Sequence, residues 1–453
     1  MKSGNSERGK APHFWVPTDE ADDRGLAMSL TAPSSVRKLQ NGLYEKAKSE
    51  PSLRFYSLYD KIYREDILQH AWEHCRANGG APGVDGVRIE DVATNEKRFL
   101  AELGKELREK TYVPSPVRRV VIPKDGGGER PLGIPTVRDR VAQTAVKLIL
   151  EPIFEADFLD EAYGYRPGRQ ALAAVKATHR ALCDGYSEVV DADLSKYFDT
   201  IPHAGLMKSV ARRVSDGALL HLIKLWLEVP TEERDDDGHR RMRSSNGCGT
   251  PQGGVISPLL ANIYMHRFLR AWRQYQGPRH FGARLINYAD DFVILCRRRP
   301  AAEAALDFTR RVMTAIGLTL NEAKTRLCNA RTDRFKFLGY ELGVDHRRDT
   351  GRFYLSAAPS KVAVKRAKAG ITELFCRAGT SEEAALVGRL NRRLQGWKGY
   401  FSYGTTGRAY SAINRHVYQR ILGFLQRRHK VHSRGTRRYS WNHVFGKMGV
   451  VLL

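Results

Sequence analysis

The sequence predicts an α+β fold, because stretches with helical periodicity alternate with short apolar stretches that have the character of strands. Residues 188–194 and 284–295 are rich in Val, Ile and Leu, and the second range predicts two strands around a tight turn. Residues 206–229 and 301–316 carry helical patterns, and the chain beyond residue 360 is helical and basic. We therefore expect an α+β core followed by a helical region.

The remaining elements follow from local patterns of the same kind. Further helices are predicted at residues 53–76, 99–110 and 141–150, and further short strands at residues 335–342 and 352–355. Residues 117–136 place three glycines after Asp125 between two apolar runs, which predicts a β-hairpin. Residues 1–50 are mixed and polar, so we expect an N-terminal extension that is partly disordered.

The charge of the chain favours nucleic acid as a partner. The 453 residues include 75 Lys and Arg against 50 Asp and Glu, a formal net charge of +25. Residues 351–453 alone carry 20 Lys and Arg against 3 Asp and Glu, with aromatic residues interleaved. A basic surface that only confers solubility is the alternative explanation of this segment.

Two other classes of protein are disfavoured by composition. No run of the sequence approaches 18 apolar residues, and the first 30 residues lack the apolar stretch of a signal peptide, so we expect a cytoplasmic protein with no membrane partner. The six cysteines are Cys75, Cys183, Cys248, Cys296, Cys328 and Cys376. Because none of them forms a C-x-x-C pair, the pattern argues against a zinc site and against a disulfide framework.

Two adjacent carboxylates, Asp290 and Asp291, lie between apolar runs at residues 285–286 and 293–295. Carboxylates in such a setting are costly unless a cation or solvent meets them. A tight hairpin would bring both to the surface of the sheet, where they suit a hard divalent cation. An ordinary acidic β-turn explains the same pair, since Asp is common in turns.

A second acidic pair, Asp191 and Asp193, falls on one face of the strand predicted at residues 188–194. For Asp191 alone we favour a solvated or salt-bridged carboxylate. Together the two clusters suggest two-metal phosphoryl transfer, in which cations about 3.5–4 Å apart act on the attacking and leaving oxygens. Asp193 and Asp290 are 97 positions apart, so their strands would have to lie side by side.

These clusters form part of a wider resemblance. Tyr-Ala-Asp-Asp at residues 288–291 resembles the palm motif of reverse transcriptases, and Asp-Leu-Ser-Lys-Tyr-Phe-Asp at residues 193–199 resembles their other metal-binding motif. The stretch that begins Gly-Thr-Pro-Gln-Gly-Gly at residues 249–263 is similar to the block between them in group II intron enzymes. The resemblance covers roughly residues 40–450.

The resemblance implies roles for particular residues. Two Mg²⁺ ions would be bound by Asp193, Asp290 and Asp291, with a further ligand from the backbone carbonyl of Leu194. The implied dNTP-binding residues are Lys124, Arg130, Leu194, Phe198 and Gln252. The implied primer grip is Phe337, Leu338, Gly339 and Tyr340. Phe198 would exclude a 2′-hydroxyl, although an ordinary core aromatic explains it too, and Lys124 and Arg130 are otherwise solvated hairpin charges.

The basic C-terminal region is similar to the thumb, or maturase, domain of group II intron proteins. Its implied RNA-binding residues are Arg392, Arg393, Lys398, Arg427, Arg428 and Lys430. We expect the neighbouring Trp397 and Tyr400 to pack helices together rather than to stack on bases. No paired cysteines of a C-terminal HNH endonuclease precede Leu453, so we expect no cutting of the second DNA strand.

The sequence therefore predicts a right-hand polymerase. Residues 1–50 would be the extension, residues 51–345 the fingers and palm, and residues 346–453 the helical thumb. It would extend a DNA or RNA primer with dNTPs on an intron RNA template, bind target DNA, and assist splicing and retromobility. The sequence does not indicate the oligomeric state.

Three alternatives remain open. The first is a reverse transcriptase used in phage defence or as a retron, which the maturase-like tail argues against. The second is an RNA-copying RNA polymerase, in which Asp199 would select the ribose, and Phe198 opposes this interpretation. The third is a non-catalytic RNA-binding splicing factor, and the intact aspartates argue against loss of the polymerase.

Overall fold

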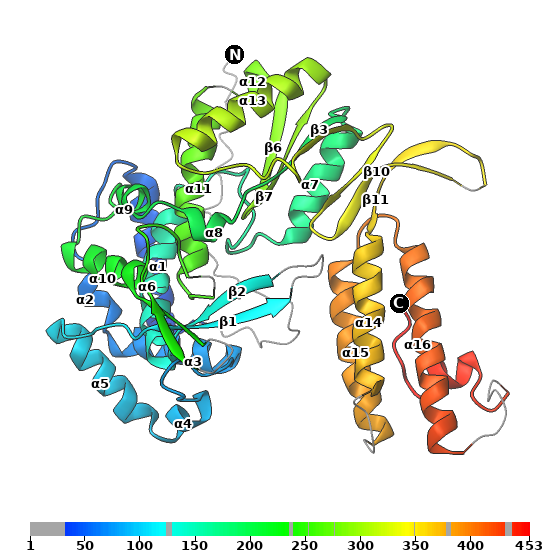
Figure 1. Cartoon of the computed structure of the whole chain (residues 1–453), viewed down its shortest axis with the longest axis horizontal. Coiled ribbons are helices and arrows are strands. Elements are labelled where there is room, and N and C mark those ends of the chain that lie inside the picture. Colours follow the sequence, from blue (N-terminus) through cyan, green and yellow to red (C-terminus); the bar gives the residue numbers. More distant parts are fainter. Residues whose placement is uncertain are drawn as a thin grey trace, which may run out of the picture.

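The computed structural model describes residues 32–123, 129–234, 239–251, 253–275, 277–347, 349–376, 382–430 and 437–453. Within these residues the chain has fingers of helices and a small sheet, a palm with a central sheet, and a thumb of long helices (Figure 1). The predicted α+β right-hand fold is confirmed. None of the described helices is long and apolar enough to cross a membrane.

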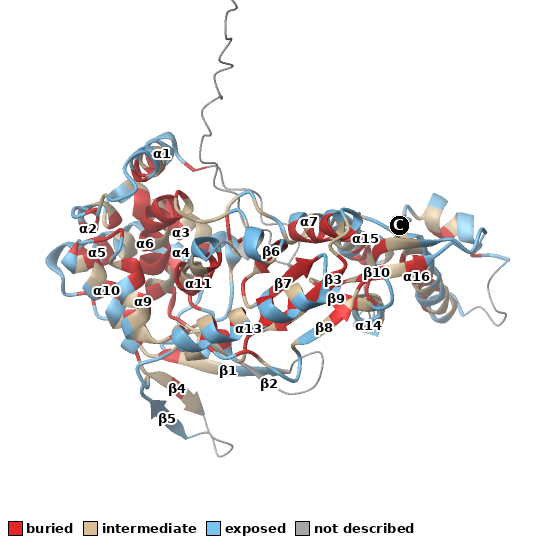
Figure 2. Ribbon diagram, turned by 90° about the horizontal axis from the view of Figure 1, so that it is seen from above, coloured by how far each residue is buried: buried red, intermediate tan, exposed pale blue. Residues whose placement is uncertain are grey.

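The fingers are packed around helix α6 (Val137–Glu155), which is buried on nearly every side because apolar residues occupy almost all of its faces. The helices around it are α1 (Ser34–Ser49), α2 (Tyr59–Ile62), α3 (Glu65–Asn78), α4 (Ile89–Thr94), α5 (Glu96–Glu109), α9 (His203–Val210) and α10 (Gly217–Glu228). Figure 2 shows the buried residues concentrated in α3, α6 and α11 and in the palm strands.

Helix α1 departs from the expectation for the N-terminal extension. It packs along α6, and Val36, Leu43 and Ala47 enter the core. Their spacing of seven and four residues places them on one helical face, which the polar composition of the segment obscures. Residues 1–31 of the predicted extension lie outside the described residues.

Two predicted helices are divided in the structure. Residues 206–229 contain α9 and α10 with a break between them, and residues 53–76 become helical only from Tyr59 onward. Asp216 explains both boundaries, because its carboxylate accepts hydrogen bonds from the backbone of Leu58 and Tyr59 before α2 and from the first turn of α10. One side chain thus caps two helices that are distant in sequence.

The strands form three sheets. The fingers sheet has the order β2-β1-β4-β5, with β1 (Val117–Pro123), β2 (Glu129–Ile134), β4 (Thr231–Arg234) and β5 (Arg240–Arg243). The palm sheet has the order β6-β7-β3-β8, with β3 (Glu188–Asp193), β6 (Ala283–Tyr288), β7 (Asp291–Cys296) and β8 (Arg326–Asn329). The third sheet has the order β11-β10-β9, with β9 (Arg334–Phe337), β10 (Tyr340–His346) and β11 (Phe353–Pro359).

The palm sheet is covered on both faces, which explains why its strands are continuously apolar. On β7, Phe292 and Ile294 enter the core shared with the fingers, whereas Val293 and Leu295 enter a second core. Helices α11 (Ser257–Gln274) and α13 (Arg299–Ala315) contribute to the first core, and α7 (Ala171–Cys183) contributes to the second. Short helices α8 (Tyr197–Thr200) and α12 (Gly277–His280) complete the palm.

The thumb has a separate core between three helices. These are α14 (Lys361–Cys376), α15 (Glu383–Tyr400) and α16 (Gly407–Arg428), followed by a π-helical turn at His443–Lys447. Leu390, Leu394 and Ile413 lie at the centre of this core. The predicted helical region beyond residue 360 is confirmed, and strand β10 runs across the boundary expected at residue 345.

Candidate active site

The strand register of the palm brings the predicted acidic residues together. Asp193 at the end of β3 lies directly opposite Asp291 at the start of β7. Directly opposed residues of an antiparallel pair have Cα atoms about 4.5–5.5 Å apart. Asp290 lies beside them in the tight turn between β6 and β7, where Ala289 has a φ of 56°. Three carboxylates from two distant segments thus meet at one corner of the sheet.

A neighbouring segment supports this turn through its backbone. The amide of Asn287 donates to the carbonyl of Glu161, and the amide of Tyr163 donates to the carbonyl of Asn287, both at 2.8 Å. A Cβ atom on Gly164 would lie 2.5 Å from the amide nitrogen of Ala289. The segment therefore approaches the turn more closely than any side chain allows, which fixes a glycine at this position.

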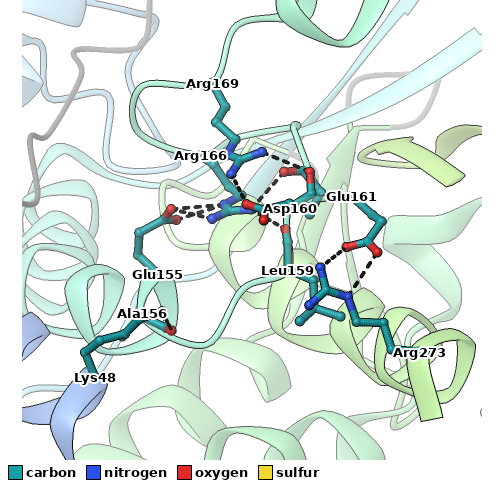
Figure 3. A network of polar contacts seen from close by, with 10 residues as sticks. Lys48, Glu155, Ala156, Leu159, Asp160, Glu161, Arg166, Arg169 and Arg273 are labelled. Carbon is teal, nitrogen blue, oxygen red and sulfur yellow. Dashed lines mark hydrogen bonds and ion pairs between the residues drawn. The ribbon is translucent and has the colours of Figure 1, made fainter. Parts of the chain in front are cut away.

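Buried and half-buried ion pairs hold that segment in place (Figure 3). The guanidinium of Arg166 is almost fully buried and pairs with both carboxylate oxygens of Glu155. It also donates to the carbonyls of Leu159 and Ala162. On the same segment Glu161 pairs with Arg273 of α11 at 2.8 Å. Arg166 thus supports the backbone beside the turn, and its hydrogen-bonding capacity is directed inward.

The carboxylates have few positive partners. Lys324 Nζ lies 3.0 Å from Asp193 Oδ2, and Asn321 Nδ2 donates to the same oxygen at 3.1 Å. Arg326 pairs with Asp191 at 3.1 Å, which agrees with the salt-bridged interpretation of that residue. Burial, followed by the charges of Asp290, Asp193 and Asp191, raises the pKa of the Asp291 carboxyl to about 7. The corner thus carries an excess of negative charge.

The donors at this corner match the chemistry of a hard divalent cation, because all of them are carboxylate oxygens. Within the described ranges, no group of three or more His, Cys, Asp and Glu side chains is positioned to hold a metal as it stands. Asp193 directs one oxygen to Lys324 instead. Lys324 and Asn321 both contact Oδ2 of Asp193, so a cation shared with Asp290 and Asp291 would bind the other oxygen, Oδ1, or would replace the lysine.

Phe198 lies beside the corner, half-buried between aromatic rings. Its ring centroid is 5.7 Å from that of Tyr197 and 6.3 Å from that of Tyr165. Its carbonyl accepts a hydrogen bond from the amide of Thr250 at 2.7 Å, so the 249–263 block begins beside the 193–199 motif. Both sequence motifs therefore belong to one site.

The structure describes the other predicted dNTP-binding residues only in part. The backbone of Leu194 forms an isolated bridge with Leu320, and its side chain is buried. Lys124, Gln252 and the side chain of Arg130 lie outside the described residues. The backbone of Arg130 pairs with Ile122 in the fingers hairpin.

The predicted primer grip is the turn between β9 and β10. Phe337 and Tyr340 are buried at its two ends, whereas Leu338 and Gly339 form the turn with φ angles of 48° and 78°. The hydroxyl of Tyr400 on thumb helix α15 donates to the carbonyl of Leu338 at 2.7 Å. The turn is thus held from the thumb side.

The predicted RNA-binding cations are all exposed, but they are not equivalent. The residues are Arg392, Arg393, Lys398, Arg427, Arg428 and Lys430. Arg393 donates to the carbonyl of Gly370 at 2.6 Å, and Lys398 donates to the carbonyl of Leu452 at 3.2 Å. These two side chains therefore also hold the thumb together. The ring centroid of Trp397 lies 5.9 Å from that of Tyr410 on α16, so Trp397 packs two thumb helices together, as expected.

Sequence reasoning did not identify the basic partners of the acidic corner. Neither Lys324 nor Arg326 is among the site residues that the sequence predicts. Their roles depend on the pairing of β8 with β3 and on the loop before it, which are tertiary contacts. A cation in an edge strand, or in the loop before it, carries no local signal of the carboxylate that it meets.

Comparisons with known proteins agree with this arrangement. A family model described as "Reverse transcriptase (RNA-dependent DNA polymerase)" matches residues 122–342. A model described as "Group II intron, maturase-specific domain" matches residues 364–441. The first match contains the acidic corner and the primer-grip turn, and the second contains most of the thumb.

Individual relatives cover the chain to different extents. It is 34% identical over 390 residues to Protein YkfC of Escherichia coli (strain K12), which covers 78% of this chain and 99% of that protein. It is 36% identical over 214 residues to Group II intron-encoded protein LtrA of Lactococcus lactis subsp. cremoris, covering 47% of this chain and 34% of LtrA. A telomerase structure from Candida albicans aligns with a TM-score of 0.43 and 12% identity, over 86% of this chain and 75% of that chain.

Proposed function

This chain belongs to the family of group II intron-encoded reverse transcriptases with a maturase domain, and on that premise we propose that it copies RNA into DNA. The reaction is attack of a primer 3′-hydroxyl on the α-phosphate of a dNTP, with release of pyrophosphate. The observation that carries the proposal is the register that sets Asp193 opposite Asp291, with Asp290 in the adjoining turn. Such a corner suits the transfer of a highly charged phosphoryl group between bound oxygens.

Asp193, Asp290 and Asp291 would hold two Mg²⁺ ions, with the Leu194 carbonyl as a further ligand. When bound, these ions lower the cost of forming the attacking alkoxide and neutralise charge on the leaving pyrophosphate. Lys324, which lies 3.0 Å from Asp193, holds that carboxylate oriented in the absence of nucleic acid. Lys124, Arg130 and Gln252 would contact the nucleotide.

The remaining site residues would position the substrates. Phe198, fixed by its neighbouring aromatic rings, would lie under the sugar and exclude a 2′-hydroxyl. The Phe337–Tyr340 turn would hold the primer terminus, and its attachment to Tyr400 supports a fixed distance between primer and thumb. Orientation of this kind contributes to phosphoryl transfer because the attacking and leaving oxygens must be in line.

The thumb would bind the intron RNA and assist its folding and splicing. The exposed cations of α15 and α16 support phosphate contacts, which give affinity with little sequence choice. The match to a maturase-specific domain over residues 364–441 favours this partner over a phage-defence or retron role. Target DNA and retromobility belong to the same proposal.

Primer extension on an RNA template with Mg²⁺ tests the function directly. We expect Asp290→Ala to abolish extension and to leave RNA binding largely intact, because Asp290 is an anion and is not one of the thumb cations proposed to contact RNA. The matched control is Asp307→Ala, which removes a surface carboxylate that pairs with Arg310 on α13. Extension by Asp290→Ala within about tenfold of the wild type would contradict the metal assignment.

The same assay separates the alternatives. Incorporation of NTPs in preference to dNTPs would indicate an RNA polymerase and would remove the role proposed for Phe198. RNA binding by a wild-type protein that extends no primer would indicate a splicing factor without polymerase activity.

A further inference from the structure

The hairpin of β10 and β11 extends beyond the sheet to which it belongs (Figure 1). Strand β9 pairs with β10 only at residues 340–343. Residues 344–346 pair with residues 353–355 of β11 and with no third strand among the described residues. An isolated two-stranded hairpin is marginally stable in water, so this distal half depends on how its base is held.

The base of the distal half is fixed by a buried carboxylate. Asp345 is 3% exposed, and its Oδ1 atom lies 2.8 Å from Arg334 on β9 and 3.7 Å from Arg408 on thumb helix α16. Arg334 also donates to the carbonyl of Val344 at 2.7 Å. The hairpin therefore leaves the body of the protein from a rigid base that joins palm and thumb.

One face of the hairpin continues past the part that the protein covers. Alternate residues of a strand share a face, and Tyr340, Leu342 and Ala357 of this face are buried in the second palm core. Phe353 continues the same face and is 78% exposed. A single exposed aromatic residue is ordinary by itself, so what distinguishes Phe353 is its place at the open end of a face that is otherwise covered.

The surroundings of Phe353 identify the kind of partner. His346 is its register partner, with ring centroids 6.3 Å apart. Arg347 follows His346 and Arg352 precedes Phe353, and both are exposed, with Arg347 3.7 Å from Asp349. Because neighbouring strand residues alternate in direction, the two arginines leave the hairpin on the face opposite to Phe353, so they would contact phosphates beside the stacked base and not the base itself. An aromatic platform flanked by guanidinium groups is the combination by which proteins hold unpaired nucleotides, through base stacking and phosphate contacts. An apolar protein surface would not require the two arginines, and an anionic lipid surface, which basic residues also attract, is one of the outcomes of the experiment below.

We propose that the tip formed by His346, Arg347, Arg352 and Phe353 is a second RNA-binding site, which stacks an unpaired base of the bound RNA on Phe353. The proposal rests on the proposed function for its RNA partner, but not on the acidic corner or on polymerase activity. It is independent of the thumb cations, because the tip lies on a strand hairpin that precedes α14 in the chain. The site would recognise loops and single strands rather than duplex.

The test measures the affinity of the full-length chain for a single-stranded RNA oligonucleotide and for an RNA duplex of the same length. Phe353→Ala is expected to weaken single-strand binding about tenfold and to leave duplex binding unchanged. Phe353→Trp should restore the affinity, since it retains a stacking ring. Tyr56→Ala is the matched control, because Tyr56 is an aromatic residue of 79% exposure on the fingers.

Three outcomes would overturn the proposal. Equal affinity of Phe353→Ala and Tyr56→Ala for single strands would show that no base stacks on the tip. An equal loss for duplex and single strand would indicate a general structural effect. Loss of binding to anionic phosphatidylglycerol vesicles, with RNA binding unchanged, would indicate a membrane surface instead.

Primer extension by the same wild-type preparation distinguishes this proposal from the proposed function. A wild type without extension, combined with the expected single-strand defect of Phe353→Ala, would leave the RNA site standing and would overturn the polymerase assignment. Normal extension by the wild type, combined with unchanged single-strand binding by Phe353→Ala, would support the polymerase assignment and would overturn the RNA site at the hairpin tip.

Discussion

The palm and the thumb differ in how they position the residues proposed to act on nucleic acid. In the palm, Asp193 and Asp291 are placed by strand register, inside a sheet that is covered on both faces. In the thumb, the cations lie on the outside of three helices around a core of their own. Chemistry at the palm therefore depends on backbone positions, whereas binding at the thumb depends on the sum of surface charges. Substitutions should separate these two kinds of dependence.

Apart from loss of an acidic residue itself, the largest effect is expected in the palm, from a substitution that changes no charge. In Gly164→Ala the new Cβ would lie 2.5 Å from the amide of Ala289, so the turn that carries Asp290 must shift. A displacement of about 1 Å in a catalytic group can lower the rate by on the order of a hundredfold. We expect primer extension to fall by that factor while RNA affinity stays at the wild-type value.

Gly42→Ala serves as its control, since no atom lies within 4 Å of a Cβ added at that helical position. Near-normal extension by Gly164→Ala would mean that the turn tolerates movement. It would contradict the idea that activity in the palm depends on exact backbone positions. A proportional loss of RNA binding would instead indicate general unfolding.

The thumb should respond to charge rather than to position. RNA affinity of the whole chain should fall steeply with salt, and Arg427→Ser should reduce the slope of log affinity against log salt by about 0.7. Arg393→Ser should act differently, because Arg393 also donates to the carbonyl of Gly370 and so joins α15 to α14. Its loss should lower the melting temperature of the protein as well as the affinity. A salt response that is flat in the wild type would contradict the role assigned to the thumb.

Sequence alone was sufficient for the palm strands β3, β6 and β7 because their signals are local, whereas β8 (Arg326–Asn329) was not predicted. Apolar runs ending in Asp193 and flanking Asp290 predict strands with acidic ends, and the resemblance to reverse transcriptases predicts that they meet. The register sets Asp193 opposite Asp291, 98 positions away, and the ion pair of Lys324 with Asp193 joins residues 131 positions apart. No local pattern encodes such a pairing.

Elements whose boundaries are set from a distance were missed for the same reason. Asp216 ends one predicted helix and begins two others, because its carboxylate is shared between α2 and α10. Phe353 resembles any other strand residue in sequence, and its exposure becomes evident only when the covered part of the hairpin is known. The thumb cations were the opposite case, since their exposure follows directly from a helical, basic composition.

The smallest expected effect is the pH dependence of stability that comes from a buried histidine of the palm. Burial, followed by the charges of Arg166 and Arg273, lowers the pKa of His266 on α11 to about 4. The unfolded chain, with an ordinary histidine pKa of about 6.5, then binds more protons between these two values, so this residue's contribution is complete above pH 6.5 and decreases as the pH falls toward 4. At pH 5.5 the loss should be about 1 kcal/mol of unfolding free energy relative to pH 7.5. The contribution of His266 is the difference between the wild type and His266→Gln in denaturant titrations at both pH values. Asp291, whose pKa is raised to about 7, shifts stability in the opposite direction over this range, but it does so in both proteins. The same pH dependence in both proteins would mean that His266 is not held neutral in the fold. Burial and the charges of Arg166 and Arg273 would then have little effect on its pKa.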